Sequence, residues 1–346
     1  MDVLKSLLSL GALILLSGCQ ISYYFSSAYN QMALLGSRVP MEKALEDPSL
    51  SEAEKQKMRL AAKVREFSEK DLHLKVTKNY TTFVKLDRPY VTYVVSASPK
   101  WELKHHLWSY PLVGKMPYKG FFNEKGALEE EDDLKKQDLD TYMRGVSAYS
   151  TLGWFNDPLL SSMLSYKDDD LVNTLIHETV HTTIYIKNSA DFNERLAVFL
   201  GGKGMELYYL KEEGADSKTL AQVKKENEDD HLFSQFISGE ISALDQWYKA
   251  QTDKSEELRQ KRIREIQDRF QKEVLPKMKT NSYERFGKLA MNNARLMVYK
   301  TYMQDLGDFE KLYQKVGGDF SKFIETCRSL ENSKKPEEDL KKLVSP

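Results

Sequence analysis

The chain has 346 residues, of which 41% are hydrophobic and 11% aromatic, and this composition predicts a globular protein with one large core or two modest ones. Its formal net charge is -1, from 51 basic and 52 acidic residues. So balanced a charge argues against nucleic acid as a partner and against recruitment to anionic lipid by charge alone.

The N-terminus has the pattern of a processing signal. An apolar run over residues 7–16 is too short to span a bilayer as a mature helix, and it ends in Leu16-Ser17-Gly18-Cys19, which resembles a bacterial lipobox. We expect residues 1–18 to be removed and Cys19 to anchor the mature chain to a membrane through lipid. An ordinary secretory signal with an accidental cysteine is the alternative. Gln20 in place of aspartate favours, by resemblance to lipoprotein sorting rules, the periplasmic face of the outer membrane in a bacterial cell envelope.

The cysteine count limits how the mature chain is stabilised. Once Cys19 carries lipid, only Cys327 remains, so no intrachain disulfide is available. A structural zinc-thiolate cluster is excluded for the same reason. Stability must therefore come from the hydrophobic core.

The first half of the chain mixes helical and strand patterns. Proline breaks divide residues 23–68 into two expected helices. Residues with strand composition then predict a small sheet, and a charge-dense stretch predicts a solvated helix. The expected strands cover residues 72–86, 90–96 and 140–149, with a loop over 101–122 and the helix over 124–137.

After Glu206 the pattern is almost wholly helical, with a long charged segment over residues 254–273. The economical prediction is one α+β unit, residues 19–346, that is predominantly helical and has a small sheet and a helical C-terminal half. A separate helical subdomain is the alternative.

A five-residue motif carries the chemistry. His177-Glu178-Thr179-Val180-His181 lies in an apolar-rich stretch, residues 171–186, that follows three aspartates at an expected helix N-terminus. On a helix, a spacing of four residues puts both imidazoles on one face, where they can share one metal ion. Glu178 then lies beside them as a general base and does not bind the metal.

A catalytic zinc ion needs a third protein ligand and an open position. Glu194 is the natural candidate, because a turn near Asn188 and Ser189 lets a second helix pack antiparallel to the first. The expected metal ligands are therefore His177, His181 and Glu194, which hold one Zn²⁺. Taken singly, each of these residues has an ordinary structural explanation, but their combination favours a metal site. His73, His105, His106 and His231 lack such spacing, and we expect them to be structural or surface residues.

Most of the mature chain resembles a family of bacterial lipoproteins assigned as zinc aminopeptidases, in which HExxH is followed by an Asn-Glu-x-x-Ala segment in gluzincin fashion. The resemblance rests on the metal motif and on four further strings. They are Tyr110–Gly114 (YPLVG), Pro117–Phe122 (PYKGFF), Gly145–Leu160 around AYSTLGWF, and Met291–Leu296 (MNNARL). Lys119 stands where we expect arginine and Ser147 where we expect proline, but no ligand or base is lost.

The resemblance implies a zincin-like metallopeptidase that acts on a peptide substrate. Tyr149 and Tyr185 are candidate donors to a developing oxyanion, although aromatic packing explains both more simply. We identify no carboxylate that would bind a substrate amine, and Gly204-Met205-Glu206 follows the metal helix where the comparable motif of one aminopeptidase family precedes it. Two alternatives remain. One is a non-catalytic envelope lipoprotein with a structural metal and a partner-binding helical half; the other is a hydrolase of amide bonds in cell-wall peptide.

Overall fold

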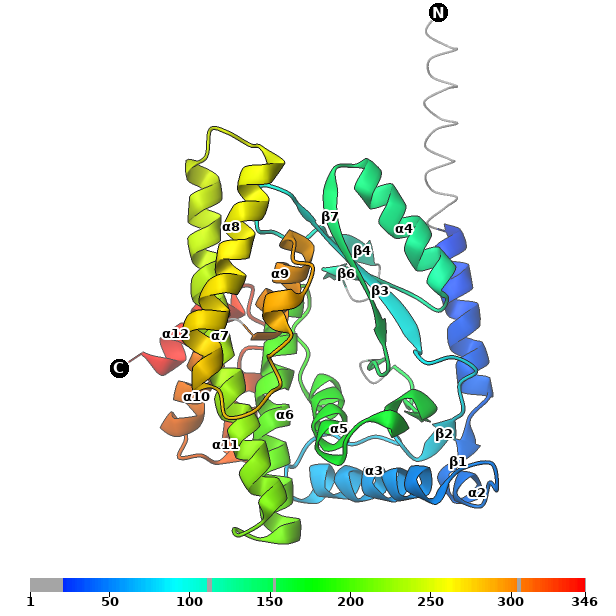
Figure 1. Ribbon diagram of the computed structural model, residues 1–346. Coiled ribbons are helices and arrows are strands. Elements are labelled where there is room, and N and C mark those ends of the chain that lie inside the picture. The colour runs from blue at the N-terminus through cyan, green and yellow to red at the C-terminus, as the bar shows by residue number, and fades with distance from the viewer. Residues whose placement is uncertain (1–20, 111–113, 152–153, 304–305, 346) are drawn as a thin grey trace, which may run out of the picture.

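The computed structural model describes residues 21–110, 114–151, 154–303 and 306–345, and Cys19 with the expected signal segment lies outside them. Within these ranges the fold is α+β and mostly helical, with small sheets, as predicted (Figure 1). None of the described helices is both long and apolar enough to cross a membrane.

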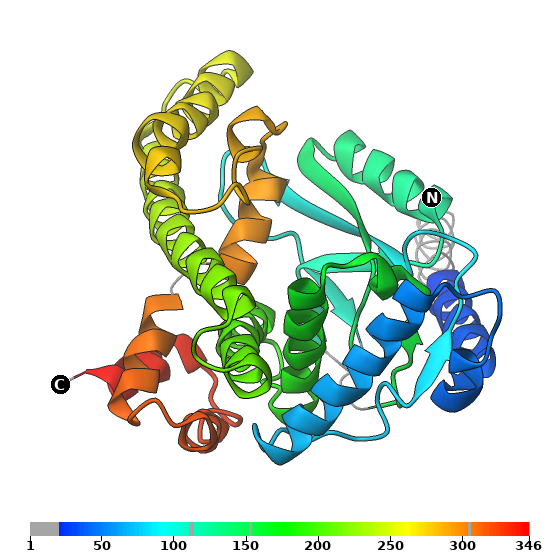
Figure 2. The ribbon, with the colours of Figure 1, turned by 60° about the horizontal axis from the view of Figure 1, so that its bottom comes forward.

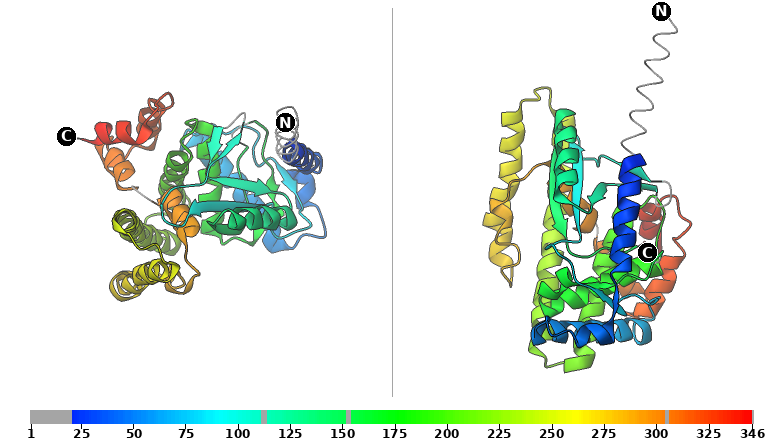
Figure 3. Two further views of the ribbon diagram at one scale, coloured as in Figure 1. Left: turned by 90° about the horizontal axis from the view of Figure 1, so that it is seen from above. Right: turned by 90° about the vertical axis from the view of Figure 1, so that its right-hand side faces the viewer.

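Three helical segments begin the described chain. Residues 21–36 form a helix at the right-hand edge of the molecule in Figure 1 and on its near face in the right panel of Figure 3. The short α2 (Met41–Leu45) follows, and then α3 (Glu52–Lys70), which begins at a capping box between Ser51 and Glu54. The predicted breaks near residues 40 and 47–48 are confirmed.

The central sheet has the strand order β6-β3-β7 and is antiparallel throughout. Its strands are β6 (Tyr118–Phe121), β3 (Thr92–Pro99) and β7 (Leu139–Val146). Helix α4 (Glu124–Lys136) covers one face, where Val95 and Ala97 of β3 pack against Ala127 and Leu134. The other face, which includes Val94 and Arg144 as cross-strand partners, lines a cavity.

The structure differs from the predicted strands in two regions of the chain. Residues 101–122, expected to be a loop, contain β6 and a hairpin of β4 (Trp108–Tyr110) and β5 (Gly114–Met116). Strands of three or four residues are too short to show alternation of polar and apolar side chains. The strand expected over 140–149 ends at Val146, so Tyr149 lies in the loop that follows.

The strand expected over residues 72–86 is also largely wrong. Only β2 (Thr82–Val84) forms, between β1 (Val39–Pro40) and β8 (Leu159–Leu160) in a second sheet. The preceding backbone finds partners on the metal-motif helix instead. The amide of Lys75 donates to the Thr183 hydroxyl at 2.9 Å, and its carbonyl accepts from Thr182 at 2.9 Å.

Two consecutive helices, α5 (Asp168–Thr183) and α6 (Ala190–Glu213), form the centre of the molecule. They run antiparallel as expected, because Glu194 at the start of α6 meets His181 at the end of α5, and Gly201 further along α6 meets Asn173 near the start of α5. An added Cβ at Gly201 would lie 2.4 Å from the Asn173 side chain, so glycine permits this close approach.

The C-terminal half is helical as predicted. The 33-residue α7 runs the length of the molecule in Figure 2. Two buried clusters share this half: one joins α10–α12 to α3, α5 and α6, and the other joins α7, α8 and α9. The helices are α7 (Lys218–Ala250), α8 (Glu256–Arg269), α9 (Asn293–Met303), α10 (Leu306–Lys315), α11 (Phe320–Arg328) and α12 (Pro336–Val344).

A polar joint fixes α9 against the central sheet. The Asn293 amide N–H donates to Asp140 at 2.9 Å, and its side chain donates to the carbonyls of Pro99 and Lys100 at 2.9 Å. Asp140 also binds the fully buried guanidinium of Arg259, through contacts of 2.5 and 3.1 Å. The MNNARL string therefore positions α9, which lies beside the sheet in Figures 1 and 3.

Candidate metal centre

A cavity of about 770 Å³ lies between the central sheet and the α5–α6 pair. The free face of the sheet forms one wall, and α5 with the start of α6 forms the opposite wall. The N-terminal helix contributes Tyr23, Ser27 and Gln31, and α9 contributes Tyr302. Elements from four separate parts of the chain therefore enclose one space.

The HExxH motif lies on α5 as predicted, and the helix face that carries the motif lines the cavity. His177, Glu178 and His181 all line the cavity, and so do Asp170, Asn173 and Thr174 from the two preceding turns. This spacing of three and four residues selects a single face of a helix. Three aspartates in the first turn of α5 stabilise the helix, because their negative charge lies at the positive end of the helix dipole.

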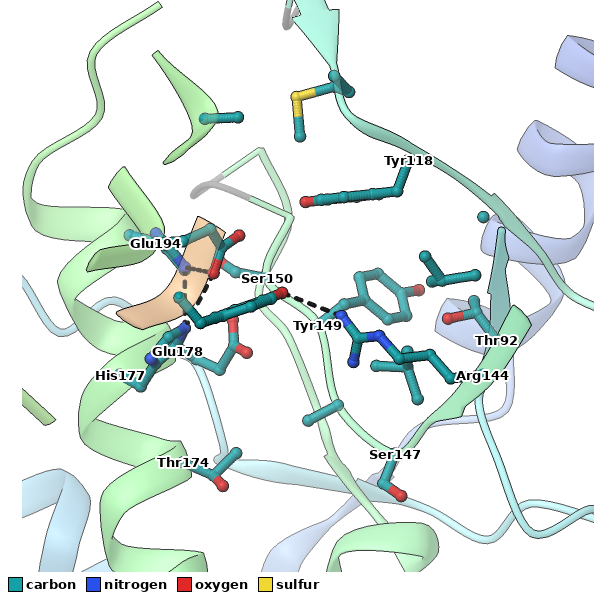
Figure 4. Close-up of a pocket in the computed structure, with 18 of the residues that line it drawn as sticks. Thr92, Tyr118, Arg144, Ser147, Tyr149, Ser150, Thr174, His177, Glu178 and Glu194 are labelled. Carbon is teal, nitrogen blue, oxygen red and sulfur yellow. Dashed lines mark hydrogen bonds and ion pairs between the residues drawn. The ribbon is translucent and has the colours of Figure 1, made fainter. Parts of the chain in front are cut away.

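The three predicted ligands converge on one point. His177 Nε2 and His181 Nε2 are 3.2 Å apart, and Glu194 Oε2 lies 3.4 Å from the first and 3.5 Å from the second. Figure 4 shows Glu194 facing the two-turn segment of α5 that carries His177 and Glu178. Of the described residues, these three form the one cluster of His, Cys, Asp and Glu side chains that could hold a metal ion.

The spacing of these atoms fits zinc. A tetrahedral ion with ligands at about 2.0–2.1 Å has neighbouring ligand atoms about 3.3 Å apart, and the three measured separations are 3.2, 3.4 and 3.5 Å. Two imidazoles and one carboxylate are also the donor set of a hydrolytic zinc site with one position left open. The residues present therefore fit a Zn²⁺ ion.

Asn193 and Glu194 have different roles: the first fixes the loop before α6, and the second faces the two histidines. Asn193 holds the loop between the helices, since its amide donates to the Ile186 carbonyl at 2.8 Å and its side-chain oxygen accepts from the Ile186 N–H at 2.9 Å. Asn188 in that loop has a φ of 62°, a left-handed conformation that asparagine tolerates. Fixing the loop places the next residue, Glu194, against the histidines.

Burial and charge set the ionisation of the cluster. Burial opposes the charge on Glu194, but the adjacent histidines outweigh it and hold the pKa of this carboxyl well below its usual value. Burial likewise disfavours a charged His181, yet the Glu194 carboxylate wins and raises the pKa of His181. The Glu194 carboxylate therefore favours the charged form of His181.

Glu178 has a different environment although it adjoins a ligand. Its Oε2 atom is buried and has no hydrogen-bond partner among the described residues. Burial raises the pKa of Glu178, against the opposing effect of the two histidines. A carboxyl with a raised pKa that lines a cavity is suited to accept and return a proton.

Comparison with known proteins agrees with this geometry. A family model described as "Putative aminopeptidase" matches residues 22–343, which is nearly the whole described chain. The chain belongs to this family. No curated protein matches it significantly, and no solved structure does. The residues matched by the family model include all three members of the buried His-His-Glu triad that could hold a metal ion.

Two tyrosines suggested from the sequence lie in the cavity of this aminopeptidase-family chain. The Tyr149 hydroxyl donates a hydrogen bond to the side-chain oxygen of Gln31 on the N-terminal helix, and the rings of Tyr149 and Phe122 are nearly perpendicular. Tyr185, just after α5, contacts the Met116 sulfur at 3.9 Å. Burial and the nearby Glu194 carboxylate raise the pKa of Tyr185, whereas burial and the Asp157 carboxylate raise the pKa of Tyr149.

Other sequence features lie away from the cavity. His105 pairs with Asp191 at 3.2 Å and fixes the first turn of α6, a structural role. Gly204 packs against Ile176 and Leu72, and Glu206 accepts a hydrogen bond from Asn227, so neither residue contacts the triad.

Sequence reasoning missed the cavity residues Arg144 and Tyr302. Arg144 Nη2 donates to the Tyr302 hydroxyl at 3.1 Å, across 158 positions of sequence. Both residues adjoin recognisable strings, since Arg144 precedes Gly145 and Tyr302 follows the MNNARL segment on the same helix. Position alone, however, does not reveal that the two side chains meet opposite the triad.

Proposed function

We propose that this protein is a zinc-dependent peptidase, with His177, His181 and Glu194 as metal ligands and Glu178 as the catalytic base. The observation that carries the proposal is the convergence of three candidate ligand atoms within 3.5 Å of one another in a cavity also lined by Glu178, whose Oε2 atom has no hydrogen-bond partner in the described part of the chain. The family match supports a peptide as the substrate.

The residues around the triad divide the work of hydrolysis. A Zn²⁺ ion, when bound by such a set, lowers the pKa of water towards neutrality and polarises a carbonyl. Glu178 takes the proton from the attacking water and returns it to the leaving amine. Tyr302 accepts a hydrogen bond from Arg144, so its own O–H proton is left to stabilise the developing oxyanion.

The same geometry favours catalysis over a purely structural metal. Structural zinc sites have four protein ligands and are closed, whereas this triad offers three ligands to an open cavity. β7 is also an edge strand of its sheet, and the segment from Arg144 to Ser150 lines the cavity. An extended peptide can lie along this edge and form backbone hydrogen bonds beside the triad.

The experiment is metal analysis and peptidase assay of the chain from Gln20 onward, with single variants of the base and of one ligand. Glu178→Gln should keep one zinc per chain and lose turnover by several orders of magnitude, whereas Glu194→Ala should lose the metal. Zinc in the parent with no cleavage of a peptide library would favour the structural alternative. Cleavage of cell-wall peptide alone would favour the other alternative, a hydrolase of amide bonds in cell-wall peptide.

We also propose that lipid on Cys19 holds the enzyme at the periplasmic face of the outer membrane. Support comes from the helix over residues 21–36, with which the described chain starts. Phe25 and Tyr29 are 74% and 75% exposed, and Ile21 and Met32 extend the same stripe at helical spacing. Lipid at Cys19 would bring a bilayer next to this stripe, and burial of apolar side chains would add to the affinity.

A further inference from the structure

The wall opposite the triad carries a single cationic side chain. Arg144 is the one lysine or arginine among the described residues that line the cavity. It projects from β7, between Thr92 on β3 and the wall that carries His177, Glu178 and Glu194 (Figure 4). A guanidinium at this position faces whatever substrate occupies the cavity.

Arg144 is partly buried, and among the described residues it has no carboxylate partner of the kind that buried arginines normally have. Among the described residues, it donates one hydrogen bond, to Tyr302, and no carboxylate lies within 4.0 Å of it. Its Nε atom is buried without a partner. Arg259 shows the contrast, because Asp140 and Glu256 both bind its buried guanidinium.

Tyr302 orients the Arg144 guanidinium but accepts a hydrogen bond from only one of its nitrogen atoms. The guanidinium carbon lies 5.5 Å from the centre of the Tyr302 ring, while Nη2 donates to the hydroxyl of the same side chain. The nearby Glu194 is already committed to the two histidines. Nitrogen donors of Arg144 therefore remain for a ligand in the cavity.

We propose that Arg144 binds a carboxylate of the substrate, which makes short peptides with a carboxylate close to the scissile bond the preferred substrate class. This inference rests on the proposed peptidase function. A guanidinium presents a planar fork of N–H donors that matches a carboxylate, and a cavity of about 770 Å³ suits a short peptide. The carboxylate belongs either to a free C-terminus or to an acidic side chain.

Calorimetric binding to zinc-loaded Glu178→Gln protein tests the proposal without turnover. The probes are one short peptide as the free acid, the same peptide as the C-terminal amide, and an amide that contains glutamate. The free acid should bind about 10- to 100-fold more tightly than the plain amide. If a side chain supplies the carboxylate, the glutamate-containing amide should have this advantage instead.

The same titrations on two further variants locate the effect. Arg144→Gln in this background should bind all three peptides with the affinity of the plain amide, and Arg144→Lys should restore part of the preference. Thr92→Val is the matched control, because it removes a hydroxyl from the same cavity wall while keeping Arg144, and it should preserve the ratio between acid and amide. Zinc content verifies that each variant retains the site.

Two results would overturn the proposal: equal affinity for all three peptides in the Glu178→Gln background, or an equal loss for every peptide on Arg144→Gln. Failure of the peptidase function is distinguishable. A carboxylate preference that depends on Arg144, in a protein whose parent cleaves no peptide, would retain this binding site and reject only the hydrolase. Peptide cleavage by the parent protein, without any preference for a carboxylate, would retain the peptidase function and reject the role of Arg144.

Discussion

Zinc should stabilise the metal-free protein by an amount that follows from the triad geometry. The three ligand atoms already lie at separations close to tetrahedral values, so the ion should bind the folded chain and not the unfolded one. At a free zinc concentration 100-fold above Kd, the stabilisation is about 2.7 kcal/mol. With an unfolding entropy of about 0.7 kcal/mol/K for a chain of this size, Tm should rise by about 4 °C.

The assay is thermal unfolding of chelator-treated protein across a zinc series. Each further tenfold in free zinc should add about 2 °C. His177→Ala and Glu194→Ala should lose the shift, because each removes one of three ligands. Glu178→Gln is the control with a neighbouring carboxyl removed, and it should keep the full shift because Glu178 is not a ligand.

Either of two results would refute this reasoning. If Glu178→Gln lost the zinc shift as completely as the ligand variants, Glu178 would itself bind the metal and could not act as the base. A parent protein whose Tm did not depend on zinc at all would remove the metal site.

Three other predictions follow from the same structure. The raised pKa of His181 implies that zinc displaces a proton, so zinc affinity should fall about tenfold per pH unit below that pKa, with proton release measured by calorimetry in two buffers. That shift also stabilises the metal-free fold below pH of about 6.5, and the contribution disappears as pH rises through the folded pKa. Asp140→Ala should cost about 3–5 kcal/mol in chemical denaturation because it removes the buried carboxylate partner of Arg259 and leaves the half-exposed Glu256 to compensate the charge, and Arg259→Met in addition should recover part of the loss. Phe25→Ser should weaken binding of the lipidated protein to vesicles while leaving hydrolysis of a soluble peptide unchanged.

The convergence of His177, His181 and Glu194 was predictable because its determinants are local. The spacing of His177 and His181 places them on one helical face, and a short loop brings Glu194 back to them. Asn193 secures that return through two hydrogen bonds to a single residue, which the sequence pattern marks only as the first half of an Asn-Glu pair. Helix periodicity and turn chemistry are sufficient to derive this arrangement.

The opposite wall was not predictable, because it depends on contacts between distant parts of the chain. β6 has only four residues, and its pairing with β3 shows no signal in a stretch of prolines, glycines and aromatics. Arg144 meets Tyr302 only after the joint at Asn293 has placed α9 against the sheet. No periodic pattern in either segment specifies the other.

The N-terminal helix links the two parts of the proposal that the sequence treats separately. Tyr23, Ser27 and Gln31 line the cavity from one face of this helix, while Phe25 and Tyr29 are exposed on another. Tyr23 also donates to the Gly120 carbonyl of β6 at 2.9 Å, so the helix is attached to the wall that carries Arg144. Because the proposed lipid site, Cys19, lies two residues before Ile21, the first described residue of this helix, a bilayer would contact the outer side of an element whose inner side bounds the cavity.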